Sequence, residues 1–156
     1  MEEENYESIT IQWIVDRDID EIMEIEEKSS DSIWTKRKIQ KVLKESNCIG
    51  HVAKKDSKIL GYIIYEIHDS YYEILKLVVD PKCRRQRVAT MLVNRLIRRL
   101  NEKGRNSILV CIREKNLAGQ LFFKKQQFTC TDILKNYYAG TNEPAYLMEI
   151  EIEDDN

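Results

Sequence analysis

The segment Leu77-Val78-Val79-Asp80-Pro81-Lys82-Cys83-Arg84-Arg85-Gln86-Arg87-Val88-Ala89-Thr90 decides the fold of this 156-residue chain. It begins with an apolar run, typical of a strand that is buried on both faces. Asp80-Pro81 ends this strand, because proline has no N–H to donate to a ladder. Apolar residues then recur at helical spacing up to Gly104, which predicts a helix with a glycine cap. They are Ala89, Leu92, Val93, Leu96, Ile97 and Leu100.

The turn between this strand and this helix is basic. The first amides of a helix have no partner within the helix, and the helix dipole favours an anion beside them. Arg84, Arg85 and Arg87 add positive charge, and Thr90 adds a hydroxyl. These features predict a phosphate site, although a solvated basic turn is the alternative.

Strand and helix patterns continue on both sides of this unit. Seven segments have strand patterns: Ile9–Val15, Ile49–Lys54, Leu60–Ile67, Glu73–Val79, Ser107–Ile112, Phe128–Leu134 and Tyr146–Ile152. Three further helices are expected, one capped by Asp16 or Asp18, one capped by Thr35, and one capped by Asn116 with Ala118, Leu121 and Phe122 inward. The order predicts a mixed α+β domain.

Composition excludes several classes of protein. The chain is 42% hydrophobic and 33% charged, which is enough for a core and a polar surface. No apolar run reaches the ~20 residues of a membrane span, and the acidic start lacks the features of a signal peptide. The four cysteines form no CxxC pair, and with two histidines they make no metal set. We therefore expect a cytoplasmic protein with reduced thiols, no metal and no membrane association.

Charge is unevenly distributed along the chain. Residues 1–31 hold twelve acidic and two basic residues, whereas residues 82–105 hold nine basic residues and one acidic residue. The pattern indicates either two solvated faces or a site for a polyanionic ligand.

Three motifs resemble those of one family, the GNAT N-acetyltransferase superfamily. Val78-Val79-Asp80-Pro81-x-x-Arg84-Arg85-Gln86-x-Val88-Ala89 resembles its motif A, R/Q-x-x-G-x-G/A. Ile112-Arg113-Glu114-x-Asn116-x-Ala118-x-x-Leu121-Phe122-Phe123, followed by Phe128, is similar to its V-R-x-x-N signature. Lys135-Asn136-Tyr137-Tyr138 and Glu143-x-Ala145-Tyr146-Leu147-Met148 resemble the branch that acetylates ribosomal-protein alanine.

The resemblance implies a single domain, 1–156, with its core at about 9–150. It implies a central twisted, mixed and mostly antiparallel sheet of about seven strands, with helices on both faces. Acetyl-coenzyme A (acetyl-CoA) would be the acetyl donor. Its pantetheine would contact Leu77, Val78 and Val79, and its phosphates would contact Arg84, Arg85, Gln86, Arg87, Val88, Ala89 and Thr90. Asn116 would contact the coenzyme from the next helix, and Trp34, Tyr137 and Tyr138 would contact the acceptor.

The chain departs from the family at four positions. Arg87 and Gln127 stand where the family has glycine. Cys111 stands at the position of the family's general base, a glutamate, and Phe123 at that of its acid, a tyrosine. The catalytic residues are therefore unknown. Tyr137 or Tyr138 as acid and Glu73 or Glu66 as base are the substitutes that the topology offers.

The resemblance favours N-acetylation of an amine, above all the N-terminal amine of a protein such as a ribosomal protein. A catalytically weakened acyl-CoA-binding or regulatory module is the first alternative, and acetylation of a small-molecule amine is the second. Nucleic-acid binding is not favoured, because the helix that carries Arg95, Arg98 and Arg99 commits its apolar stripe to the core. The oligomeric state stays open.

Overall fold

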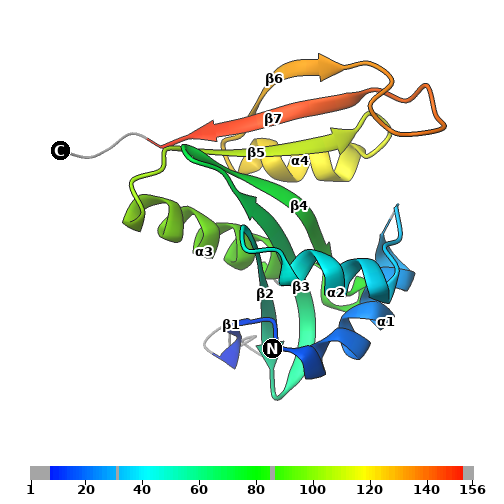
Figure 1. The fold of residues 1–156 in the computed structure, drawn as a ribbon, viewed down its shortest axis with the longest axis vertical. Coiled ribbons are helices and arrows are strands. Elements are labelled where there is room, and N and C mark those ends of the chain that lie inside the picture. Colours follow the sequence, from blue (N-terminus) through cyan, green and yellow to red (C-terminus); the bar gives the residue numbers. More distant parts are fainter. Residues whose placement is uncertain (1–7, 31, 85–86, 153–156) are drawn as a thin grey trace, which may run out of the picture. The chain divides into compact units, whose positions relative to one another are not determined.

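The computed structural model describes residues 8–30, 32–84 and 87–152 (Figure 1). Its contacts divide the chain into two compact units, which are described separately. Unit 1 comprises Met1–Glu66 and Lys76–Leu96, and unit 2 comprises Ile67–Leu75 and Ile97–Asn156.

The expected alternation of strands and helices is confirmed. The elements are β1 (Thr10–Trp13), α1 (Ile19–Ser29), α2 (Lys36–Lys44), β2 (Cys48–Lys55), β3 (Lys58–Ile67), β4 (Tyr71–Val79), α3 (Val88–Glu102), β5 (Ser107–Arg113), α4 (Leu117–Lys125), β6 (Thr129–Leu134) and β7 (Ala145–Glu151), with short 3₁₀ helices at Asp16–Asp18 and Pro81–Cys83. The strands form a seven-stranded sheet in the order β1-β2-β3-β4-β5-β7-β6. The β4–β5 pair is parallel, whereas β1–β2, β2–β3, β5–β7 and β6–β7 are antiparallel. The expected mixed, mostly antiparallel sheet is thus confirmed.

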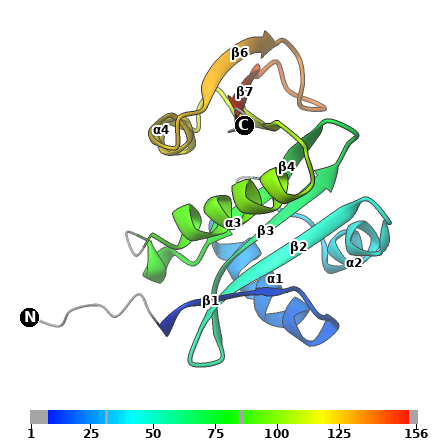
Figure 2. The same ribbon diagram turned by 90° about the vertical axis from the view of Figure 1, so that its left-hand side faces the viewer.

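In unit 1, helices cover both faces of the strands. Figure 2 shows α1 and α2 on one face and the first turns of α3 on the other. The α3 side chains Leu92, Val93 and Leu96 are fully buried, as their spacing predicts. Asp18 is the N-cap residue of α1, one of the two expected, but its side chain does not cap the helix: the carboxylate accepts instead from the Val15 N–H and from the Lys54 ammonium.

The end of β4 differs from the prediction of a strand buried on both faces. Val78 is buried, but Leu77 and Val79 are only half-buried. The two sides of a strand alternate, so one side of β4 packs beneath the helices that cover it while the other keeps some solvent access. This accessible side bears on the candidate site.

In unit 2, α4 lies against β5, β7 and β6 (Figure 1). The expectation that Ala118 and Leu121 point inward is wrong, because both are exposed. Phe123 is buried instead and meets Phe128 edge to face, with 5.0 Å between ring centroids. The reason lies at the end of α4. The N–H of Phe128 donates to the carbonyl of Phe123 at 3.0 Å, and this reversal of the chain brings the two rings together.

Among the residues that the structure describes, no helix combines the length and the apolar character that crossing a membrane would require.

Candidate active site

The turn after β4 is fixed by short hydrogen bonds to its neighbours. The Asp80 N–H donates to the carbonyl of Leu60 on β3 at 2.8 Å, and the Asp80 carboxylate accepts from the Lys82 N–H at 3.0 Å. Cys83 is buried, and burial, followed by the nearby Asp80 carboxylate, raises the pKa of its thiol. Arg84, the next residue, is exposed. The turn therefore buries the thiol and leaves the first of its arginines accessible.

Arg87, at the position where the family's motif has glycine, has a left-handed backbone. Its φ is 60°, in the left-handed region that normally favours glycine. Its carbonyl accepts from the Met91 N–H at 3.0 Å and so starts the hydrogen bonding of α3. The turn thus keeps a glycine-like path while it carries an exposed guanidinium-bearing side chain.

Gly61 lets β3 approach the beginning of α3. A Cβ at this position would lie 2.9 Å from the Val78 carbonyl oxygen and 3.1 Å from Cγ1 of Val88. These spaces are too tight for an unshifted methyl group, so glycine permits the close packing. Val88 is buried and packs against β3 at Gly61, and this contact holds the first turn of α3 close to the strands.

Unit 1 brings most of the predicted coenzyme residues into one strand–turn–helix segment. Arg85 and Gln86 lie outside the described residues. The segment contains Leu77, Val78, Val79, Arg84, Arg87, Val88, Ala89 and Thr90. Asn116 belongs to unit 2, where its side chain accepts from the Gly119 N–H at 2.9 Å and caps α4 as predicted. Its coenzyme contact stays a prediction.

A buried carboxylate holds the backbone at Trp34. Glu26 of α1 is fully buried, and its Oε2 accepts from the Trp34 N–H at 2.7 Å and from the Lys76 ammonium at 2.8 Å. Its Oε1 accepts from the Tyr62 hydroxyl at 2.6 Å. Burial, followed by this hydrogen bond, raises the pKa of Tyr62 far above its usual value. Every oxygen of the carboxylate thus has a partner, as a buried charge requires.

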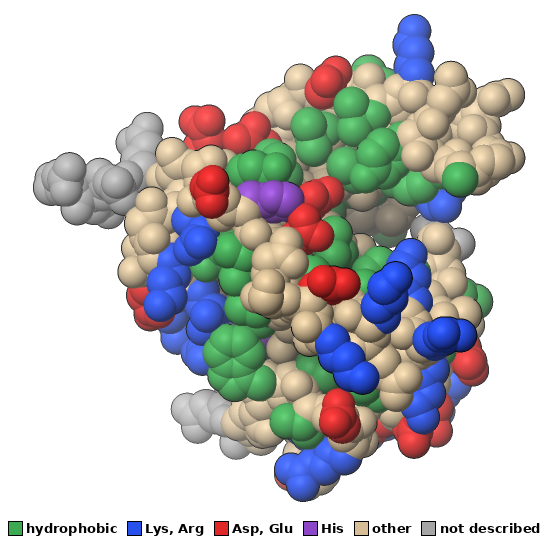
Figure 3. Space-filling view, in the orientation of Figure 1, with side chains coloured by type: hydrophobic (Ala, Val, Ile, Leu, Met, Phe, Trp, Pro, Cys, Tyr) green, Lys and Arg blue, Asp and Glu red, His purple; other side chains and the backbone are tan. Residues whose placement is uncertain are grey.

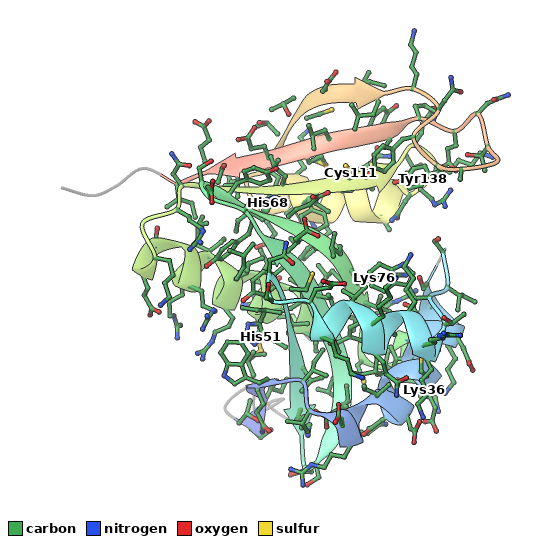
Figure 4. The ribbon with its side chains drawn as sticks, viewed as in Figure 1. Lys36, His51, His68, Lys76, Cys111 and Tyr138 are labelled. Carbon is green, nitrogen blue, oxygen red and sulfur yellow. The ribbon has the colours of Figure 1, made fainter. Side chains whose placement is uncertain are left out.

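The same lysine reaches the segment between α1 and α2. The Lys76 ammonium donates to Oγ of Ser30 at 2.6 Å and to the carbonyl of Ser32. It also lies 5.2 Å from the centroid of the Trp34 ring, and the Lys38 ammonium lies 4.5 Å from it. Figure 4 shows Lys76 extending from β4 toward α2. Sequence reasoning missed this network. Its one signal was a lysine inside the apolar run of β4.

Unit 2 gathers a second group of polar side chains around Cys111. Glu73 pairs with Leu109 in the parallel ladder, so Glu73 and Cys111 share one face of β4 and β5. The Tyr137 hydroxyl is hydrogen-bonded to the Cys111 thiol. Burial raises the pKa of Cys111, and the Glu73 carboxylate adds to the rise, although the hydrogen bond from Tyr137 opposes it. Cys111 is therefore a neutral thiol at physiological pH.

Tyr137 remains protonated in this setting. Burial, the hydrogen bond to Cys111 and the Glu73 charge raise the pKa of Tyr137 to about 12. Its side chain is still 47% exposed, so a substrate can reach it. Tyr137 therefore offers an accessible O–H donor at neutral pH.

The loop that carries both tyrosines is fixed by Arg113. The Arg113 guanidinium donates to Glu143 at 2.9 Å and lies 3.9 Å from the centroid of the Tyr138 ring. Partial burial acts to raise the pKa of Glu143, but hydrogen bonds from the Lys115 N–H and from Arg113 outweigh it and lower that pKa. Figure 4 labels Cys111 on β5 and Tyr138 on the loop after β6. The ion pair thus joins the end of β5 to the loop before β7.

The remaining candidates have other surroundings. Phe123 is buried against Phe128 and can donate no proton. Glu66 belongs to unit 1, where its carboxylate lies 4.0 Å from the Cys48 thiol. Glu73 lies in the unit that contains Cys111 and Tyr137.

Comparison with known proteins gives the class. The acetyltransferase (GNAT) family matches residues 18–128. A Bacillus subtilis (strain 168) protein, provisionally named a ribosomal protein bS18-alanine N-acetyltransferase, is 30% identical over 139 residues, covering 88% of this chain and 91% of its own. The Haemophilus ducreyi ribosomal protein bS18-alanine N-acetyltransferase is 24% identical over 143 residues, covering 90% of this chain and 98% of its own.

Solved structures share the fold. Ard1 from Thermoplasma volcanium has a TM-score of 0.86 at 24% identity and covers 94% of this chain and 99% of its own. The Escherichia coli ribosomal-protein-S18-alanine N-acetyltransferase has a TM-score of 0.83 at 20% identity and covers 95% of this chain and 97% of its own. The chain belongs to the acetyltransferase (GNAT) family.

Proposed function

We propose that this protein is an acetyl-CoA-dependent N-acetyltransferase that modifies the N-terminal α-amine of a protein in the cytoplasm. Membership of the GNAT family and the names of the relatives support this reaction. A ribosomal protein with an N-terminal alanine is the first acceptor to test, because both curated relatives are named for that substrate.

The observation that carries the proposal is the left-handed backbone at Arg87. A pyrophosphate needs closely spaced N–H donors at a helix start, and this conformation preserves the required turn without glycine. The exposed Arg84 and Arg87 add charge where the phosphates would bind. The backbone of Leu77, Val78 and Val79 would receive the pantetheine, and the residues present therefore fit acetyl-CoA.

Tyr137 and Glu73 are the proton-transfer residues in this proposal. The acceptor nitrogen attacks the thioester carbonyl carbon, the carbon–sulfur bond breaks, and coenzyme A leaves as a thiolate. Tyr137 gives that thiolate a proton, because its raised pKa keeps the hydroxyl protonated. Glu73 removes the proton of the attacking nitrogen through water. Cys111 orients the Tyr137 hydroxyl and does not act as a base, because its own pKa is raised.

One observation favours a second candidate, an acyl-CoA-binding module without turnover. The side chain at the position of the family's acid, Phe123, is now part of the hydrophobic core of unit 2. A binding module would keep the turn at Arg87 and would need neither Tyr137 nor Glu73.

Release of free coenzyme A distinguishes the two candidates. The protein is mixed with acetyl-CoA and a peptide that begins with alanine, and the liberated thiol is measured. The control is the same peptide with its N-terminus already acetylated. Release with the free amine alone supports the acetyltransferase. Thermal stabilisation by acetyl-CoA, with no coenzyme A released in the presence of any peptide, would support the binding module instead.

A further inference from the structure

Helix α2 carries a basic groove that the proposed reaction does not explain. The helix contains five cations and no carboxylate: Lys36, Arg37, Lys38, Lys41 and Lys44. A groove of about 400 Å³ runs along it, lined by Thr35, Arg37, Lys38, Lys41, Val42 and Glu45. We call this feature the α2 groove. Figure 3 shows lysine and arginine side chains gathered on the face of the molecule that carries α2.

The cations that line the α2 groove are Arg37, Lys38 and Lys41. Lys36, outside the groove, pairs with Asp20 of α1 at 2.6 Å. Within the described part of the chain, no carboxylate forms an ion pair with Arg37, Lys38 or Lys41. These three side chains are exposed, and Glu45 is the single acidic residue of the lining. The groove therefore has a net positive charge that an acidic ligand would complement.

The α2 groove begins at Thr35, directly after Trp34, which is predicted to contact the acceptor. Lys38 lines the groove, and its ammonium also lies 4.5 Å from the centroid of the Trp34 ring. Oγ1 of Thr35 accepts from the Lys38 N–H at 3.1 Å, which fixes the start of α2 directly after Trp34. A chain that passes Trp34 therefore meets Lys38 first and Lys41 one helical turn later.

We infer that the α2 groove binds acidic side chains that follow the first residue of the acceptor, so that the acceptor is a protein with an acidic N-terminal segment. This inference rests on the proposed function and adds the substrate class. The nine residues of α2 span about 13 Å, which is the length of about four residues of extended chain. Acidic side chains on that stretch would lie over Lys38 and Lys41.

The test compares three peptides that share the same first residue and differ in the four that follow, which are acidic, neutral or basic. We expect kcat/KM to be highest for the acidic peptide, and the difference to shrink as salt is added. The variant Lys38→Glu/Lys41→Glu should lower kcat/KM for the acidic peptide roughly tenfold and raise it for the basic peptide. Its KM for acetyl-CoA should not change. Lys44→Glu is the matched control, because Lys44 lies on α2 but not in the groove.

Binding of a fluorescent acidic peptide, read by anisotropy, separates this inference from the proposed function. Acidic-peptide binding that needs Lys38 and Lys41, without acetylation of any peptide, would refute the proposed function and support the groove as a binding site. Equal kcat/KM for all three peptides would refute the inference and leave N-acetylation standing. An equal effect of Lys44→Glu, or tighter binding of an RNA oligonucleotide than of the acidic peptide, would also refute it.

Discussion

The Lys76 ammonium lies 2.8 Å from Oε2 of Glu26, and both side chains are buried in unit 1. Glu26 lies on α1 and Lys76 on β4, so this ion pair joins a helix to the strand beneath it. The same two side chains bind the backbone at Trp34 and at Ser32. A buried charge pair thus sets the conformation of the segment predicted to meet the acceptor.

Glu26→Gln should destabilise the protein by about 3–5 kcal/mol, because it leaves the buried Lys76 ammonium without the carboxylate that balances its charge. Urea unfolding measures this change. Glu27→Gln is the control, since Glu27 is the neighbouring carboxylate and is exposed. Its effect should stay within about 0.5 kcal/mol.

The double variant Glu26→Gln/Lys76→Met shows whether the charge pair also positions Trp34. Removing both charges should restore much of the lost stability. The KM of the double variant for the acceptor should nevertheless exceed that of the wild type, because the hydrogen bonds from Lys76 to Ser30 and Ser32 are lost. An acceptor KM equal to that of the wild type would show that the pair only stabilises the fold.

Periodicity and capping rules predicted the elements well. The alternating strands, the stripe of α3, and the caps at Thr35 and Asn116 are local features, and each is confirmed. Local pattern also revealed the turn after β4, because a strand, a proline and a basic stretch follow one another directly. These features depend only on neighbouring residues, so the sequence was sufficient.

The Glu26–Lys76 pair could not be predicted, because fifty positions separate the two residues and only the fold brings them together. The sequence also failed to predict which side of α4 faces the core. Its apolar residues Leu117 and Leu121 are exposed, while Phe123 turns inward to meet Phe128 beyond the end of the helix. A spacing rule applied inside the helix cannot include that partner.

Arg87→Gly should separate backbone strain from charge at the turn. Glycine accepts a φ of 60° readily, so the free energy of unfolding should rise by about 0.5–1 kcal/mol. The lost guanidinium should raise the Kd for coenzyme A about fivefold, measured by titration calorimetry at low salt. An unchanged Kd would show that Arg87 does not contact the phosphates.

Gln127→Gly is the matched substitution in unit 2. Gln127 has a φ of 73° and follows α4, where its N–H donates to the carbonyl of Lys124 at 3.0 Å. Replacing a left-handed residue by glycine at a helix end should stabilise the protein by about 0.5–1 kcal/mol. The Kd for coenzyme A should not move, and thermal unfolding together with calorimetry checks both points. A loss of stability would contradict the strain assigned here.

Tyr137→Phe should lower kcat about 10²–10⁴-fold, because the variant retains the ring and loses the proton donor. Tyr138→Phe is the control and should have a small effect, since its ring still stacks on Arg113. A reduction of kcat by less than threefold in Tyr137→Phe would exclude Tyr137 as the acid.

The pH profile of the wild type gives a separate check on Tyr137. With a pKa of about 12, Tyr137 keeps its proton through the whole working range. The rate should therefore rise through about pH 8, where an N-terminal amine ordinarily loses its proton, and then stay level to about pH 10. A decline between about pH 8 and 9 that shifts in Tyr137→Phe would contradict the raised pKa.

The most direct test of the central claim is to locate the acetyl group on the product. A peptide with a free N-terminal alanine and an internal lysine is incubated with the protein and acetyl-CoA, and fragment-ion mass spectrometry identifies the modified nitrogen. We predict that the acetyl group is on the N-terminal α-amine and that the lysine is unmodified. Acetylation of the lysine alone would contradict the proposal. So would a peptide that stays unmodified although the protein binds acetyl-CoA.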